Sequence, residues 1–151
     1  MITVDGLYQE NNSRTFDLPD DDAEALAGML RYFYGLKPHL AAKDPGIYFE
    51  LKLFAVAGKY DVQGLLEECV AKVKAFLEVG WHTSSFSQVV FDIYERIPAH
   101  GSELRNVARD ICREHLTVLM LKKDFKQIML GSPELQFNIL KKLADEERAR
   151  R

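Results

Sequence analysis

The chain has 151 residues, a formal net charge of −3 and an apolar share of 47%. That length suits one domain or one and a half, and the composition is ordinary for a globular protein. The sequence has no basic stripe and no RNA-binding motif, which excludes nucleic acid from the expected partners. No signal peptide, long apolar run or lipidation site is visible, and both cysteines lie on apolar helical stripes. These features predict an intracellular protein, cytoplasmic or nuclear, that does not bind membranes.

The amino-terminal part of the chain predicts a strand followed by a helix. Arg14–Leu18 alternates apolar and polar residues, which favours a short half-buried strand. A run of aspartates then begins a helix, and Asp21 with Glu24 has the spacing of a capping box. That helix is expected to end at Gly35 and to bury one face, formed by Leu26, Met29, Leu30, Phe33 and Tyr34. Residues 36–46 predict a loop.

Residues 49–77 predict two buried helices joined by a tight turn at residues 60–62. The first helix is apolar nearly all round, so other elements have to cover most of its sides. The second helix has apolar residues at the helical spacing i, i+3, i+4 and i+7. This stripe consists of Val62, Leu65, Leu66, Cys69, Val70, Val73, Phe76 and Leu77.

The helical pattern restarts after Gly80. Ser85, Ser102 and Ser132 are each expected to cap a helix, Ser85 together with Gln88. The predicted face of the last helix consists of Leu135, Ile139, Leu140 and Leu143. In sum, the pattern predicts a mainly α fold with one strand and six or seven helices in hairpins.

Several motifs follow one another in a recognisable order across residues 7–77. Tyr8-Gln9-Glu10 precedes the predicted strand, and a Leu-Pro-Asp-Asp turn follows it. The next helix ends in Tyr32-Phe33-Tyr34, and Ala57-Gly-Lys59-Tyr60-Asp61 precedes a leucine-rich helix. In this order the segment resembles the carboxy-terminal half of a BTB/POZ domain of the fungal type. Residues 86–143 more loosely resemble the BACK or three-box helical extension of BTB adaptors.

The resemblance implies two parts: a partial BTB/POZ-like domain in residues 1–79 and a BACK-like helical extension in residues 80–151. A complete BTB/POZ domain also has an amino-terminal half with a dimer-forming helix, which residues 1–6 cannot supply. We therefore expect either a shortened gene product or a different, mostly helical unit. Homodimerisation by the family route is not expected, because the dimer helix is absent.

The resemblance also implies a function, that of an adaptor between a cullin scaffold and a substrate that becomes ubiquitinated. Tyr8 and Glu10 stand where cullin-binding adaptors carry an apolar-x-Glu motif. Tyr34, Leu36 and Phe86 are further candidate contacts with a protein partner. The alternative for the aromatic run 32–34 is a place in the core, and for Phe86 a role with Trp81 as a plug between the two parts.

The sequence offers little for catalysis, and we expect no enzyme, cofactor or metal. The histidines are scattered, without the spacing of a metal site, and the glycines lack that of a phosphate loop. Cys112 and His115 are one helical turn apart, which leaves a small helical enzyme or ligand-binding domain as one alternative. A truncated BTB remnant without a partner is the other.

Overall fold

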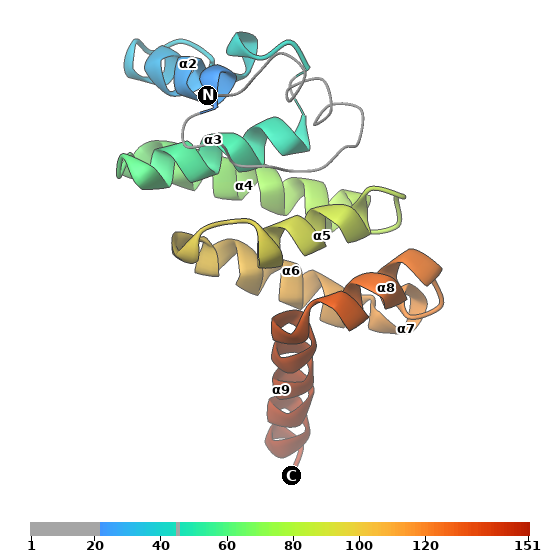
Figure 1. The fold of residues 1–151 in the computed structure, drawn as a ribbon. Helices are drawn as coiled ribbons and strands as arrows, with labels where there is room; N and C mark the ends of the chain where they lie inside the picture. Colours follow the sequence, from blue (N-terminus) through green and yellow to red (C-terminus); the bar gives the residue numbers. More distant parts are fainter. Residues whose placement is uncertain (1–21, 45) are drawn as a thin grey trace. The chain divides into compact units, whose positions relative to one another are not determined.

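The computed structural model describes residues 22–44 and 46–151, and every regular element in those ranges is a helix (Figure 1). The predicted mainly helical fold is thereby confirmed, whereas the predicted strand Arg14–Leu18 lies outside the described residues. The α-helices are α2 (Ala23–Phe33), α3 (Ile47–Lys59), α4 (Gln63–Gly80), α5 (Phe86–Glu95), α6 (Ser102–Glu114), α7 (Leu116–Leu119), α8 (Lys123–Gly131) and α9 (Pro133–Ala149). Two short 3-10 helices are η1 (Pro38–Ala41) and η2 (Ala99–Gly101).

The chain divides into two compact units, Met1–Cys69 and Val70–Arg151. This division falls inside α4, whereas the sequence predicted a boundary between residues 79 and 80, at the end of the same helix. The apolar stripe of α4 continues without interruption through Cys69 and Val70. The local pattern therefore contains no signal for the division.

In the first unit, α3 and the turn after it form as predicted. Asp61 adopts a left-handed φ of 57°, and the amide of Val62 donates to the carbonyl of Ala57 at 2.8 Å. This is the bonding of a Schellman-type helix end, with Asp61 in the position that glycine usually takes. The buried residues of α3 point to all sides of the helix: Phe49, Leu51, Leu53, Phe54, Ala55, Val56 and Ala57. The prediction that α3 is covered on most sides is confirmed.

The apolar stripe of α4 is also confirmed. Four of its members, spaced one turn apart, are at most 1% exposed: Leu65, Cys69, Val73 and Leu77. The other four are half-buried. Burial of a large apolar side chain contributes about 1.5–3 kcal/mol. Because the buried residues recur at every turn from Leu65 to Leu77, they stabilise this helix along most of its length.

In the second unit, α6 packs against α5 and α9, and α8 packs against the same two helices. The largest fully buried side chains of this unit come from the end of α4, from α7 and from every one of these helices: Leu77, Phe86, Ile93, Leu104, Leu119, Phe125, Leu135 and Ile139. The Tyr94 hydroxyl donates to the carbonyl of Arg105 at 3.2 Å and accepts from Asn138 Nδ2 at 3.0 Å. One side chain thus joins α5, α6 and α9.

The helix starts differ from the predicted caps. Asp22, the residue after Asp21, caps α2 by accepting from the amide of Ala25 at 2.9 Å. Ser85 and Ser132 precede α5 and α9 but make no side-chain cap bond, and Ser102 is the first residue inside α6. Ser85 and Ser132 therefore hold the predicted N-cap positions without a side-chain bond, whereas Asp22 and Gly101 take the N-cap positions predicted for Asp21 and Ser102.

Candidate functional site

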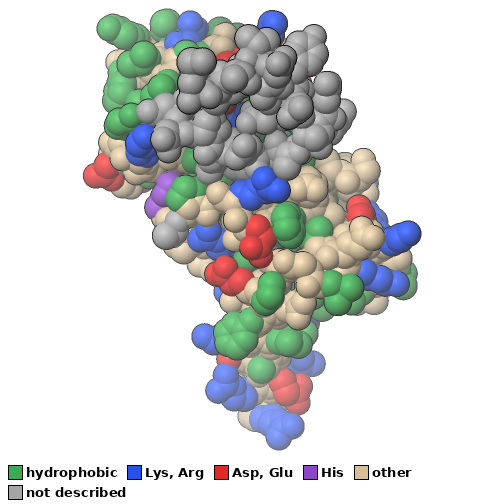
Figure 2. Space-filling model, viewed as in Figure 1, with side chains coloured by type: hydrophobic (Ala, Val, Ile, Leu, Met, Phe, Trp, Pro, Cys, Tyr) green, Lys and Arg blue, Asp and Glu red, His purple; other side chains and the backbone are tan. Residues whose placement is uncertain are grey.

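Large apolar side chains are exposed at the end of α2 and in the segment that follows it. Phe33 is 59% exposed and Tyr34 80%, although both were expected in the core. We call the whole set the 30–40 surface; it consists of Leu30, Phe33, Tyr34, Leu36 and Leu40, each at least 50% exposed. Hydrophobic side chains gather over this part of the molecule in Figure 2.

The exposure follows from which face of α2 is packed. The buried residues of α2 are Ala25, Gly28 and Met29. An alanine Cβ at Gly28 would lie 3.0 Å from Phe49 Cζ of α3 and 3.3 Å from the carbonyl oxygen of Pro38 of η1. Glycine therefore lets α3 and η1 approach this face of α2 closely. At 3.6 residues per turn, Leu30 points away from Gly28, whereas Phe33 lies one turn after Met29 and is exposed as the last residue of α2.

The end of α2 turns the chain so that its apolar residues continue onto η1. Gly35 has a left-handed φ of 71°, and the amide of Leu36 donates to the carbonyl of Arg31 at 2.9 Å. The Arg31 guanidinium Nε donates to the carbonyl of Lys37 at 2.8 Å. These bonds fix the segment between α2 and η1, and η1, which carries Leu40, packs on α2.

The charged residues within the segment that carries the 30–40 surface are all cationic. Residues 25–43 contain Arg31, Lys37 and Lys43 but no aspartate or glutamate. Glu24 stands just before this range, and its carboxylate accepts from the backbone amide of Lys43 at 2.9 Å. The site is thus an apolar area with a cationic rim, which favours a partner that is apolar at the centre and acidic at its edge.

The predicted site residues fall into three groups. Tyr34 and Leu36 are exposed and belong to the 30–40 surface. Tyr8 and Glu10 lie outside the described residues. Phe86 is 1% exposed in the core of the second unit, so its side chain cannot reach a partner, and we withdraw it from the site. In the sequence, Phe86 already lies on the apolar stripe of α5, and that pattern predicts a buried side chain.

Leu30 and Phe33 were expected in the core and are exposed, and the reason is visible in the sequence pattern. An apolar stripe in α2 predicts burial, but it does not tell whether neighbouring elements cover that stripe or another face. The useful signal was the pair of small residues Ala25 and Gly28, which permit close approach on the opposite side.

Cys112 does not offer a nucleophile. Its side chain is fully buried, and burial raises the pKa of the Cys112 thiol to about 12. The neighbouring His115 stacks on Trp81, with ring centres 3.8 Å apart and planes 7° from parallel. Since the thiolate is the reactive form, this pair lacks the chemistry that the enzyme alternative requires. Trp81 thus stacks on the residue that follows α6, and the expected plug of Trp81 with Phe86 stays a prediction.

Two further searches gave no site within the described part of the chain. No three histidine, cysteine or acidic side chains there lie close enough together to hold a metal ion. Within the same part, no helix has the length and apolar character needed to cross a membrane.

Comparison with protein-family models, curated proteins and solved structures finds no match for this chain. The BTB/POZ resemblance of residues 7–77 therefore stays a prediction.

Proposed function

We propose that this chain is a protein–protein interaction module that docks a partner on the 30–40 surface. The observation that supports the proposal is the cluster of five large apolar side chains, each at least half exposed, within one short segment. Contiguous exposed apolar surface is typical of interaction sites, and aromatic residues such as Phe33 and Tyr34 are common binding hot spots.

The size of this surface sets the affinity we expect. Full burial of a large apolar side chain contributes about 1.5–3 kcal/mol, so closing the remaining exposed area of the five would contribute roughly 5–9 kcal/mol. Lost translational and rotational freedom opposes this by several kcal/mol. The 30–40 surface alone therefore supports binding that is about micromolar or weaker, as suits a transient adaptor contact.

The partner we propose is a cullin-type scaffold, with a substrate protein bound elsewhere on the chain. The support for a cullin is the resemblance in residues 7–77, where Tyr8 and Glu10 precede the 30–40 surface. The support from chemistry is the cationic rim of Arg31, Lys37 and Lys43, which calls for acidic residues around the partner's apolar contact. The two cysteines are buried free thiols, which fits the intracellular location that an adaptor of a ubiquitin ligase requires.

A chain that keeps a folded remnant without any partner is the second candidate. The two candidates differ in a measurable property, which is cullin binding. A remnant without a partner is not expected to bind a cullin through particular side chains. The enzyme alternative has lost its nucleophile at Cys112, and no other observation favours it.

The test is retention of the purified chain by an immobilised cullin amino-terminal region. We expect Tyr34→Ala to weaken binding at least tenfold, as removal of a hot-spot aromatic does, and Glu10→Lys to weaken it as well. Val79 of α4 is 75% exposed and outside the 30–40 surface, so Val79→Ala is the matched control and should leave binding unchanged. No retention of the unaltered chain at about 50 μM would remove the cullin proposal.

A further inference from the structure

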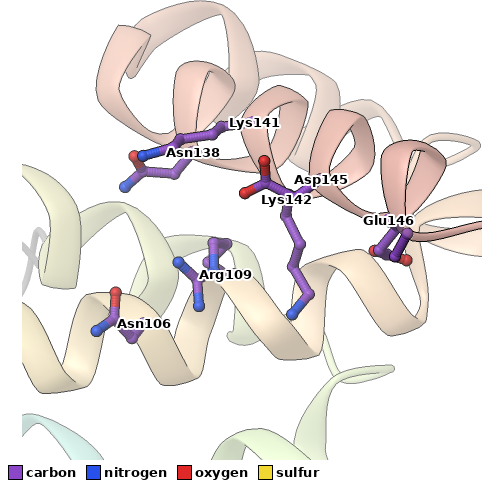
Figure 3. A pocket seen from close by; sticks show the side chains of 8 residues that line it. Asn106, Arg109, Asn138, Lys141, Lys142, Asp145 and Glu146 are labelled. Atoms are coloured by element: carbon purple, nitrogen blue, oxygen red, sulfur yellow. The ribbon is translucent and has the colours of Figure 1, made fainter.

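A polar groove lies between α6 and α9 in the second unit (Figure 3). Its volume is about 560 Å³, inside the range of roughly 300–1,000 Å³ that small-ligand sites occupy. Asn106 and Arg109 line it from α6. The lining residues of α9 are Asn138, Lys141, Lys142, Asp145, Glu146 and Ala149. Since every lining side chain except that of Ala149 is polar or charged, the groove suits a hydrophilic ligand.

The two carboxylates that line the groove are already neutralised by arginines. Both oxygens of Glu146 accept from Arg113 Nε, at 3.1 and 2.8 Å. Asp145 forms an ion pair with Arg148, one turn further along α9. Neither carboxylate is therefore available to balance the remaining cations of the groove.

Two of those cations converge on a single oxygen. Arg109 Nε and Lys142 Nζ each lie 3.0 Å from Asp110 Oδ1. In Figure 3, Lys142 extends from α9 toward α6, beside Arg109. Burial opposes the ionised form of Asp110, but the hydrogen bonds from Lys142 and Arg109 outweigh it and lower the pKa of this carboxyl. One carboxylate thus holds two positive charges together.

Lys141 adds a further positive charge. Within the described residues it has no carboxylate at ion-pair distance, and its side chain is exposed. Glu134, the next acidic residue toward the start of α9, is not among the lining residues. The groove and its direct ion-pair partners therefore carry an excess of two positive charges, in a chain whose net charge is −3.

Amide groups stand beside these cations. Asn138 Nδ2 donates to the Tyr94 hydroxyl at 3.0 Å, which anchors the Asn138 side chain at the groove. Asn106 lines the groove from α6. Amides offer both donors and acceptors, so they can complement a ligand that carries hydroxyl groups next to its charged group.

We propose that the α6–α9 groove binds the dianionic phosphate of a phosphate monoester, with Lys141, Lys142 and Arg109 as its cationic contacts. Such a phosphate carries a charge of about −1.5 to −2 and three strong acceptor oxygens, which matches the excess of two positive charges. A single carboxylate would balance only one of them. Arginine and lysine beside one another are also the usual pair for phosphate, the first as a planar fork and the second as a point charge.

The ester can come from a small metabolite or from a phosphorylated side chain of a protein, and the experiment distinguishes the two. The full chain is titrated with O-phosphoserine, glycerol 3-phosphate and a short phosphoserine peptide, followed by NMR or calorimetry. Binding of the first two with dissociation constants on the order of 1 mM supports the phosphate site. A peptide that binds at least tenfold tighter than O-phosphoserine identifies a protein ligand, and equal affinities identify a small molecule.

The variants separate a built site from general charge attraction. Lys141→Gln should weaken O-phosphoserine about tenfold without loss of stability, because Lys141 makes no ion pair among the described residues. Lys126 of α8 is exposed and outside the groove, so Lys126→Gln changes the net charge equally and should leave affinity within about twofold.

Two results would overturn the proposal: no saturable binding of O-phosphoserine at about 10 mM, or equal weakening by Lys126→Gln and Lys141→Gln. Neither result bears on the cullin experiment, because the 30–40 surface shares no residue with the groove. The two proposals therefore stand or fall separately.

Discussion

At the scale of single residues, Asp92 of α5 is a carboxylate with no exposed surface. Its Oδ1 accepts from Gln88 Nε2 at 3.0 Å and lies 3.4 Å from Arg96 Nε, while its Oδ2 has no hydrogen-bond partner in the described part of the chain. Burial raises the pKa of Asp92 from 3.8 to about 6, against the opposing effects of Gln88 and Arg96. Folding therefore disfavours the charged form of this residue.

A raised carboxyl pKa makes a defined contribution to the dependence of stability on pH. The folded state binds the Asp92 proton more tightly than the unfolded state, so the stabilising contribution is complete below pH 3.8 and is lost as the pH rises through about 6. A shift of this size corresponds to about 3 kcal/mol. Asp92→Asn removes the titration, and we expect the stability of the variant relative to the original protein to rise by about 2–3 kcal/mol between pH 4 and pH 7.

The measurement is urea unfolding of both proteins at several pH values. The diagnostic quantity is the change with pH of the stability difference between the two proteins. The asparagine amide also alters the bonds to Gln88 and Arg96, but this adds the same offset at every pH. A difference that stays constant from pH 4 to pH 7 would contradict the assignment of a raised pKa to Asp92.

Cysteine reactivity is the second prediction at this scale. Cys69 is 1% exposed and Cys112 0%, and burial raises the pKa of the Cys112 thiol to about 12. Neither thiol should react with an aromatic disulfide reagent in the native protein at pH 8, and both should react in denaturant. Fast native labelling of Cys112 would restore the enzyme alternative.

At the scale of secondary-structure elements, the first turn of α4 lies against α2. A Cβ at Gly64 would collide with the hydroxyl oxygen of Tyr32, whereas the ring carbon beneath that oxygen would lie 3.4 Å away. Alanine normally stabilises a helix by about 1 kcal/mol relative to glycine. Here we expect Gly64→Ala to destabilise the protein by about 1–2 kcal/mol, because the overpacking cost exceeds that gain.

Removing the hydroxyl tests the cause. In Tyr32→Phe the same Gly64→Ala substitution should be neutral or stabilising, which gives a coupling energy of at least about 1 kcal/mol in a double-mutant cycle. Gly46 has open space around its Cβ position, so Gly46→Ala serves as the control for glycine replacement. Equal effects of Gly64→Ala in the two backgrounds would show that α2 and α4 do not approach each other at this point.

Comparison of the elements with their sequence patterns shows which signals carry information. The turn after α3 and the stripe of α4 are set by many apolar residues at regular spacing, so both could be predicted. The caps at Ser85 and Ser132 could not, because they depend on single side chains with other options. Gln88, for example, bonds to Asp92 and not back to the start of α5. Burial of Leu140 was also predicted wrongly: it is 63% exposed on the outer side of α9.

At the scale of the whole molecule, the candidate site was only partly predictable. Tyr34 was named from the resemblance and Leu36 from its place in the predicted loop 36–46, and both are exposed. The rest of the 30–40 surface depends on which face of α2 receives α3 and η1, a tertiary fact that an apolar stripe does not contain. The α6–α9 groove was not predicted at all, since it brings together residues from two helices about thirty positions apart.

The most direct measurement is an amide hydrogen-exchange footprint of the chain with a purified cullin amino-terminal region. We predict slower exchange in residues 30–40 on binding, and loss of that protection with Tyr34→Ala but not with Val79→Ala. Phe137 and Leu140 of α9 are another exposed apolar pair at helical spacing, at 64% and 63%. Protection centred on α9, or none near Tyr34, would contradict the claim that the 30–40 surface is the docking site.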